Sequence, residues 1–388
     1  MNTTQQGIIL LMKSAVTGEK LVLPADFDIE AAVPEINRHK IHTLVFQGAV
    51  NCSVPKKHPV MQQLFQKYCR AMLVSEGQMR EVHRIYQAFD ENGIDYMPLK
   101  GCNMKSRYPK PELRIMGDAD ILIRMEQYEK ISAIIEALGF SFKCESDHEL
   151  IWQSGSLYLE LHKRLVPSYQ RDLSPFFDGC WERAEVTGGT RYGMLPEDEW
   201  IFLFTHFAKH CRDSGIGCRH VVDLWVFLRS YPQLRESYVM DALERLQLLE
   251  FYENMRKLMR VWFEQESSDD MTEILTAYIF ESGNWGDAIS GVLSGVVRNS
   301  RSKAEIKHAR LQYLWRYAFP SLEIMQRRHK ILKKAPWLLP VMWVVRLLYK
   351  ALFDKKEQKR VQRNFSVITE ENIQNRQTLL RLIGLDYH

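Results

Sequence analysis

Hydrophobic and polar positions divide the chain into helical ends and a short β-prone middle. Apolar residues recur at three- and four-residue spacing through much of the first 90 residues, most clearly over 61–89. The pair Asn92-Gly93 then predicts a helix end. Strand-like patterns follow at 94–99, 120–124, 140–144, 149–153 and 157–162. Helical spacing returns at 125–138, inside this block, and again after Pro167.

These changes predict an α+β fold in which a small mixed β-sheet is flanked by N- and C-terminal helical regions. Four regions are expected along the chain: an N-terminal helical region (1–90), an α/β core (91–166), a helical domain that completes a cleft (167–297), and a basic, Trp-containing C-terminal helical region (298–388).

Two aspartates enter the second predicted strand with one residue between them. Because strand side chains alternate, Asp118 and Asp120 point to one face, whereas Ala119 and Ile121 point to the other. Carboxylates held together repel each other unless a cation lies between them, and a divalent metal is the usual solution.

A third carboxylate lies on the last predicted strand, where leucines alternate with Tyr158, Glu160 and His162. If this strand pairs beside the first two aspartates, then Glu160 completes a cluster able to hold two Mg²⁺ ions, with Mn²⁺ as a substitute. His162 shares its face and is interpreted as either a hydrogen-bonded wall residue or a contact to phosphate, base or acceptor.

A phosphate-binding turn is predicted next to these carboxylates. Gly101 stands between a strand and a short predicted helix at 102–108, where backbone N–H groups can approach an anion. Lysine and arginine side chains in the same segment can add cationic contacts. Nucleotide or phosphate binding is therefore assigned to Lys100, Gly101, Cys102, Arg107 and Arg114.

These motifs resemble the uncharacterised nucleotidyltransferases of the DNA polymerase β-like superfamily, over roughly 60–230. The resembling residues are Leu99-Lys100-Gly101, Tyr108-Pro109, Arg114, Gly117-Asp118-Ala119-Asp120 and Glu160-Leu161-His162. The resemblance implies Mg²⁺-dependent transfer of a nucleoside monophosphate from an NTP, with Asp118, Asp120 and Glu160 as catalytic metal ligands. One departure is Cys102, where the superfamily usually has Gly or Ser; phosphate binding then depends on Lys100 or is weakened.

Histidines on a later predicted helix, at 198–211, form a second candidate group. His206, Lys209 and His210 are expected to line the acceptor side of the cleft or to bond Asp223. A zinc site is the alternative, although the spacing matches no standard ligand set.

Composition indicates a globular protein of the reducing cytoplasm. The 388 residues are 46% hydrophobic and 26% charged, which excludes disordered, collagen-like and coiled-coil chains. The seven cysteines form no C-x-x-C pair, so neither a disulfide framework nor a zinc ribbon is expected. The N-terminus lacks the pattern of a signal peptide. No membrane span is expected, because the longest apolar run, 335–345, has 11 residues.

Positive charge is concentrated near the C-terminus. The segment 298–363 holds 18 Lys/Arg and 4 Asp/Glu, a local charge of +14 in a chain of net charge +4. Three interpretations stay open: a basic face packed against the acidic remainder, peripheral contact with anionic lipid, and a nucleic-acid surface. The first is preferred, with lipid ahead of nucleic acid.

The expected partners are an NTP, with ATP as the default donor, and an acceptor that can be a small molecule, a sugar, a protein or RNA. Two other functions remain open. One is a catalytically inactive nucleotide- or partner-binding module, such as an antitoxin. The other is an RNA-directed nucleotidyltransferase, which predicts strong, salt-dependent RNA binding.

Overall fold

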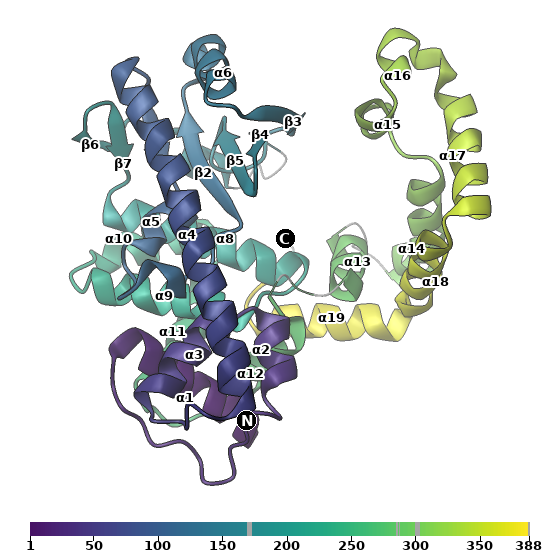
Figure 1. The fold of residues 1–388 in the computed structure, drawn as a ribbon. Helices are drawn as coiled ribbons and strands as arrows, with labels where there is room; N and C mark the ends of the chain where they lie inside the picture. The colour runs from purple at the N-terminus through teal and green to yellow at the C-terminus, as the bar shows by residue number, and fades with distance from the viewer. Residues whose placement is uncertain (169–172, 285, 287, 299–302, 387–388) are drawn as a thin grey trace. The chain divides into compact units, whose positions relative to one another are not determined.

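The computed structural model describes the chain except for residues 169–172, 285, 287, 299–302 and 387–388 (Figure 1). Two compact units are present. The first comprises Met1–Ala208 and Gly217–Asn284, and the second comprises Lys209–Ile216 and Trp285–His388. The candidate carboxylates all belong to the first unit.

The first unit contains a seven-stranded mixed sheet with the order β3-β4-β5-β2-β1-β7-β6. Two neighbouring pairs, β2–β5 and β1–β7, are parallel, and the other pairs are antiparallel. The predicted α+β class with a small mixed sheet is thereby confirmed. The strands are β1 (Tyr96–Pro98), β2 (Asp118–Ile123), β3 (Ser141–Glu145), β4 (Glu149–Ser154), β5 (Leu157–His162), β6 (Glu185–Gly188) and β7 (Arg191–Gly193).

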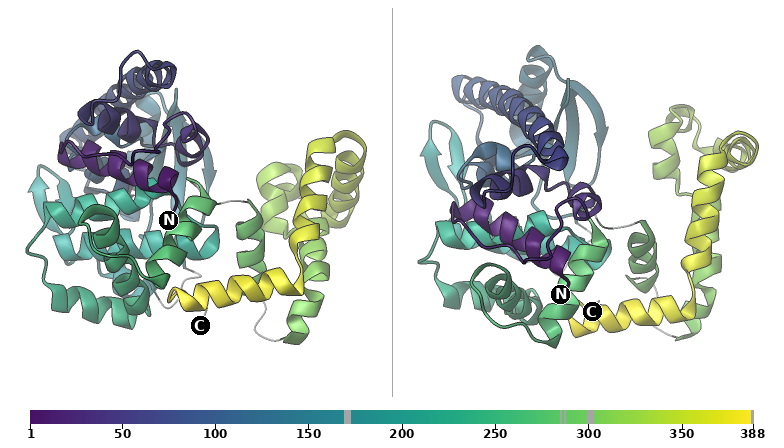
Figure 2. Two further views of the ribbon diagram at one scale, coloured as in Figure 1. Left: turned by 90° about the horizontal axis from the view of Figure 1, so that it is seen from below. Right: turned by 60° about the horizontal axis from the view of Figure 1, so that its bottom comes forward.

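Helices before, within and after the sheet complete this unit. They are α1 (Thr3–Thr17), α2 (Val33–His39), α3 (His42–Asn51), α4 (Pro59–Glu91), α5 (Lys100–Lys105), α6 (Tyr128–Ala137), α7 (Ser174–Asp178), α8 (Pro196–Asp213), α9 (Cys218–Ser230), α10 (Glu236–Arg245), α11 (Leu249–Phe263) and α12 (Asp270–Ser282). The last residues of α8 belong to the second unit. Helices α1 and α3 lie side by side (Figure 2).

One face of the sheet is covered by α4 and α6 (Figure 1). The odd-numbered residues of β2, such as Ile121 and Ile123, are at most 1% exposed and pack with Ile85 of α4 and Ile131 of α6. In β5 the leucines, such as Leu159, fill the same core. Strand alternation therefore turns the acidic residues of both strands to the opposite face, as the sequence predicted.

The second unit is helical beyond α8. Its helices are α13 (Ala288–Arg298), α14 (Lys303–Ala318), α15 (Leu322–Arg328), α16 (Ile331–Lys334), α17 (Leu339–Phe353), α18 (Lys355–Val367) and α19 (Glu370–Leu382). Val296 and Val297 of α13 share a small core with Ile368 and with Ile373 of α19. Arg376 of α19 donates to the carbonyl oxygen of Cys211 (3.2 Å), which ties the end of α8 to this unit.

One helical segment departs from the prediction of no membrane span. Among the residues that the structure describes, Pro336–Phe353 has 18 residues, is long and apolar enough to cross a membrane, and is not buried. The uninterrupted apolar run ends before Arg346, whereas the helix continues past Arg346 and Lys350 to Phe353. Length and composition of a single helix are weak evidence for a span.

Candidate active site

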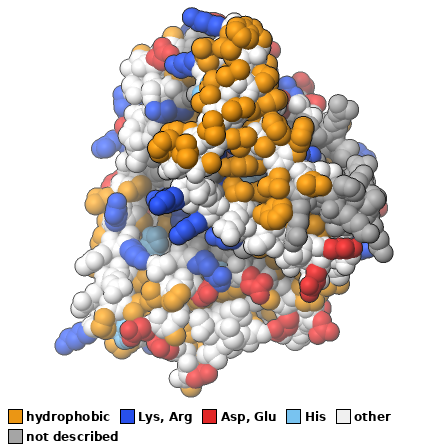
Figure 3. All heavy atoms as spheres, turned by 90° about the vertical axis from the view of Figure 1, so that its right-hand side faces the viewer, with side chains coloured by type: hydrophobic (Ala, Val, Ile, Leu, Met, Phe, Trp, Pro, Cys, Tyr) orange, Lys and Arg blue, Asp and Glu red, His pale blue; other side chains and the backbone are white. Residues whose placement is uncertain are grey.

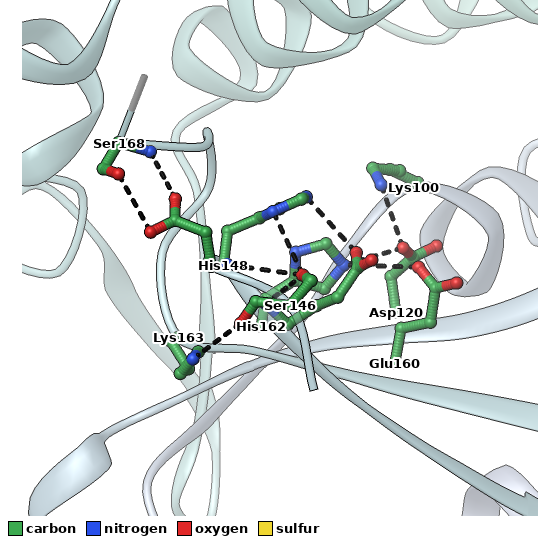
Figure 4. Close-up of polar contacts among 10 residues, drawn as sticks. Lys100, Asp120, Ser146, His148, Glu160, His162, Lys163 and Ser168 are labelled. Carbon is green, nitrogen blue, oxygen red and sulfur yellow. Dashed lines mark hydrogen bonds and ion pairs between the residues drawn. The ribbon is translucent and has the colours of Figure 1, made fainter. Parts of the chain in front are cut away.

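Asp120 and Glu160 are neighbours across two parallel strands. In the register of β2 and β5, Asp120 pairs with Glu160, and Asp118 pairs with Tyr158. One ligand atom each from Asp120, Glu160 and His162 lies within 4.8 Å of the others. Figure 4 shows these three side chains turned toward one another. The predicted pairing of the two acidic strands is therefore present, and it places the side chains at metal-ligand separation.

His162 is a closer member of this group than the sequence indicated. Its Nε2 lies 2.9 Å from Oδ1 of Asp120 and 3.8 Å from Oε2 of Glu160, and the side chain is almost fully buried. A carboxylate can only accept, so Nε2 carries the proton in this contact. The other ring nitrogen, Nδ1, is buried and has no hydrogen-bond partner among the described residues. His162 is thus a hydrogen-bonded wall residue, and Nε2 would be a candidate ligand only in the tautomer that carries the proton on Nδ1.

Lys100 supplies a cation to the same carboxylate. Its Nζ donates to Oδ1 of Asp120 at 2.9 Å, and Lys100 adopts a left-handed backbone conformation (φ 39°) at the start of α5. Its ammonium also lies 5.9 Å from the ring centre of Phe202 on α8. The predicted phosphate-binding lysine therefore lies beside the carboxylates (Figure 4).

The three acidic residues of the site differ in the direction of their pKa shifts. Burial raises the pKa of Glu160 to about 8, and the charges of Asp120 and Asp118 add to the rise. Burial and Asp120 also raise the pKa of Asp118. Burial opposes ionisation of Asp120 as well, but Lys100 and His162 hold its pKa below the usual range. The raised pKa values of Asp118 and Glu160 show that neighbouring groups disfavour their ionised forms, which a bound cation would favour.

Asp118 lies two residues before Asp120 on the same face of β2, but it is not part of the close three-residue group. It is half-buried, whereas Asp120 is buried. The charge of Asp120 raises its pKa, whereas Lys100 and Arg114 oppose the rise. Its assignment as a metal ligand stays a prediction.

Gly101 and Cys102 follow Lys100 inside α5. A Cβ on Gly101 would lie 3.1 Å from Nη1 of Arg114 and 3.2 Å from Cγ of Met116, so a larger residue would crowd these side chains. Burial, with the charge of Asp120, raises the pKa of the Cys102 thiol to about 12. Cys102 is therefore a neutral, buried group next to the predicted phosphate turn.

Arg114 and Asp223 are paired with each other. Nε and Nη2 of Arg114 donate to the two carboxylate oxygens of Asp223 at 3.0 and 3.2 Å, and both side chains are buried. The hydroxyl of Tyr108 donates to the same carboxylate at 2.6 Å. This network joins the loop before β2 to α9. The predicted roles of Arg114 at phosphate and of Asp223 at the acceptor stay predictions.

Arg107 is also engaged within the protein. Its Nη2 donates to Oε2 of Glu199 on α8 (2.5 Å) and to the hydroxyl of Tyr231 (3.0 Å). The nearby Lys105 is buried and donates to Ser75 of α4 and to two loop carbonyls. The contacts of Arg107 and Lys105 hold α5 and the loop after it in place. The phosphate contact of Arg107 stays a prediction.

The remaining acceptor-side candidates lie on α8. His206 belongs to the first unit and contacts the ring of Phe202, with the ring centres 6.5 Å apart, whereas Lys209 and His210 belong to the second unit. Across the described part of the chain, the only group of three or more metal-ligating side chains is that of Asp120, Glu160 and His162. That group contains no residue of α8, so the described residues give no support to a zinc site there.

Comparison with known proteins agrees with the motifs. A sequence model of a family described as uncharacterised nucleotidyltransferase matches residues 25–264, which is more than half of the chain. The chain belongs to this family. The resemblance drawn from residues of the strands and turns is thereby confirmed, and the family name indicates nucleotidyl transfer in general. A comparison with curated proteins found no match.

Two solved structures of the antibiotic-resistance factor ANT(2″)-Ia are similar to this nucleotidyltransferase-family chain. The solution structure is 16% identical, with a TM-score of 0.35, over 46% of this chain and 98% of that one. The crystal structure in complex with adenylyl-2″-tobramycin is 18% identical, with a TM-score of 0.33, over 45% and 99%. At these values the likeness gives no basis for choosing an acceptor.

Proposed function

We propose that this protein transfers a nucleoside monophosphate from an NTP to an acceptor hydroxyl in a reaction that depends on Mg²⁺. The observation that carries the proposal is the placement of Asp120 and Glu160 side by side on β2 and β5, with ligand atoms within 4.8 Å and Lys100 alongside. ATP is the default donor because it is abundant in cells.

The donor atoms fit a divalent cation. Carboxylate oxygens suit Mg²⁺, and a mixed set of carboxylates and imidazole also suits Mn²⁺. Asp118, Asp120 and Glu160 would hold the metal, with His162 next to them. When bound, one or two such ions would neutralise the carboxylates and polarise the phosphate oxygens of the donor.

The residues of the chain account for the other parts of the reaction. Lys100 offers an ammonium to the triphosphate beside Asp120, and Gly101 keeps the start of α5 free of a side chain. The acceptor oxygen forms a bond to the α-phosphorus while the bond to pyrophosphate breaks in line. Glu160, once ionised, accepts the acceptor proton. The electrons of the broken P–O bond, and with them the negative charge, leave with pyrophosphate.

The proposal is tested by calorimetric titration of each NTP into the full-length protein, with and without Mg²⁺. The D118N/D120N variant removes two carboxylate charges, and Asp241→Asn on the exposed side of α10 serves as the matched control. We expect Mg²⁺-dependent binding of one NTP to the wild type and the control, and none to the double variant.

A folded wild-type protein that binds no NTP in the presence of Mg²⁺ would contradict the proposal and leave a partner-binding module as the better description. Binding that the double variant retains would contradict the placement of the site. Once a donor is identified, the same nucleotide carrying a radiolabel on its α-phosphate reports transfer, because the label moves to the acceptor rather than to pyrophosphate.

A further inference from the structure

Helix α17 exposes a stripe of apolar side chains (Figure 3). The side chains of this stripe are 50–72% exposed: Val341, Val344, Val345, Leu348, Leu352 and Phe353. Most recur at three- or four-residue spacing, so they share one face of the helix. Soluble proteins rarely expose a continuous apolar surface of this kind without a partner.

The polar side chains of α17 contact the end of α14 and the residues that follow it. Arg346 donates to the carbonyl oxygen of Tyr317 at the end of α14 (2.8 Å), and its guanidinium lies 5.0 Å from the ring centre of Tyr317. Lys350, one turn further on, lies 5.0 Å from the same ring. The indole of Trp343 donates to the carbonyl of Pro320 at 2.9 Å. These contacts turn the apolar stripe outward.

Positive charge borders the stripe at both ends. Lys333 and Lys334 are exposed before α17, and Lys355, Lys356 and Lys359 are exposed after it. No Asp or Glu occurs from 324 to 353. An apolar face flanked by lysines matches the two layers of an anionic membrane surface, where acyl chains lie below negatively charged headgroups.

We infer that α17 docks the protein on the surface of an anionic lipid bilayer without crossing it. A crossing helix would carry Arg346 and Lys350 into the acyl region, but their contacts with Tyr317 hold them on the helical unit. Exposed Trp315 packs on Phe319, with the ring centres 4.5 Å apart, and adds an indole suited to the interface.

A second copy of the chain fits this surface less well than a bilayer does. In a symmetric dimer the same patch would face itself, so that lysines at its border would meet lysines rather than acidic residues. A bilayer with anionic headgroups supplies the charge that the segment lacks.

The test uses the full-length protein and sedimentation with vesicles of phosphatidylcholine, with and without phosphatidylglycerol. We expect binding to the anionic vesicles that weakens as salt is raised. Val345→Glu places a carboxylate in the stripe and should weaken binding by about tenfold or more. Val22→Glu makes the same change at a position 92% exposed in the first unit and should leave binding unchanged.

A second variant, Lys355→Gln/Lys356→Gln, leaves the apolar stripe intact and should reduce the preference for anionic vesicles. No binding to anionic vesicles would overturn the inference, as would binding that Val345→Glu retains in a protein with an unchanged circular dichroism spectrum. Protein that alkaline carbonate fails to extract from vesicles would show a crossing helix and also overturn it. Dimers in light scattering that Val345→Glu dissociates, without vesicle binding, would assign the stripe to a second copy.

Discussion

Asp120 and Glu160 are register partners on parallel strands, yet their pKa values are shifted in opposite directions. Lys100 and His162 both contact Oδ1 of Asp120 at 2.9 Å and lower its pKa, whereas burial and neighbouring carboxylates raise the pKa of Glu160 to about 8. The pair therefore combines one carboxylate that is ionised throughout the physiological range with one that is poised to exchange a proton near neutral pH.

The first prediction concerns the metal. Asp120→Asn removes the charge that attracts the cation while keeping the shape of the side chain. We expect Mn²⁺ affinity, measured by electron paramagnetic resonance of the free ion, to fall by about 100-fold or more. Asp241→Asn on α10 should bind Mn²⁺ as the wild type does. Equal affinity in all three proteins would place the metal elsewhere.

The second prediction concerns the proton on Glu160. Its pKa of about 8 means that the side chain is mostly protonated at pH 7 without metal. A bound cation favours the ionised form, so binding should release about one proton at pH 7 and progressively less as the pH rises above 8. Metal affinity should accordingly rise with pH up to about 8 and then level off.

Calorimetry in buffers of different ionisation enthalpy measures the number of protons released. Glu160→Gln has no proton to lose, so its binding enthalpy should not depend on the buffer. A wild-type enthalpy that is equally independent of the buffer at pH 7 would show that Glu160 is ionised before the metal binds.

The third prediction concerns the buried pair of Arg114 and Asp223. Asp223→Asn leaves the guanidinium of Arg114 buried without a compensating charge, so the free energy of unfolding should fall by about 3 kcal/mol. Glu81→Gln breaks an exposed ion pair with Arg84 on α4 and should cost about 0.5 kcal/mol or less. Urea unfolding followed by tryptophan fluorescence measures both losses of unfolding free energy. Similar losses would show that the buried pair stabilises the protein no more than the exposed pair does.

The acidic face of β2 and β5 could be predicted because burial leaves a period-two pattern in the sequence. Leu159 and Leu161 alternate with Glu160 and His162, so which residues share a face follows from geometry alone. The register between the two strands cannot be read from this pattern, because it depends on packing across the sheet. β6 and β7 were missed because their residues are exposed or half-buried and show no apolar alternation; only Gly188-Gly189 marks their turn.

The contacts of the basic residues could not be predicted. The sequence predicts a phosphate contact for Arg114 from its place in the basic segment around Gly101, but its partner Asp223 is 109 residues away along the chain. Arg107 likewise contacts Glu199, 92 residues away. A charge pattern identifies where cations lie, whereas tertiary packing decides which anion each one contacts. The nearness of His162 to the metal-ligand group could have been inferred, since it shares a face with Glu160.

A fourth prediction concerns the stability of the first unit in acid. His39 is fully buried: its Nε2 lies 3.1 Å from the carbonyl oxygen of Phe280, and its Nδ1 accepts from the backbone N–H of Cys218 at 3.3 Å. Burial, aided by the charge of Arg38, lowers the pKa of His39 to about 4, although Phe280 and Glu35 oppose the shift. The unfolded chain binds this proton more readily than the folded one.

The stabilisation from neutral His39 is therefore complete above about pH 6.5 and is lost as the pH falls from 6.5 toward 4, by up to about 3 kcal/mol. His39→Gln keeps a donor for Phe280 but does not titrate. Urea unfolding of both proteins between pH 4 and 7 isolates the share of His39 from that of other acid-sensitive groups, such as His42, whose pKa burial also lowers to about 4. The difference in unfolding free energy between wild type and variant should shrink as the pH falls, because only the wild type loses this contribution. Parallel curves would mean that His39 takes up its proton without disturbing the contacts to Phe280 and Cys218.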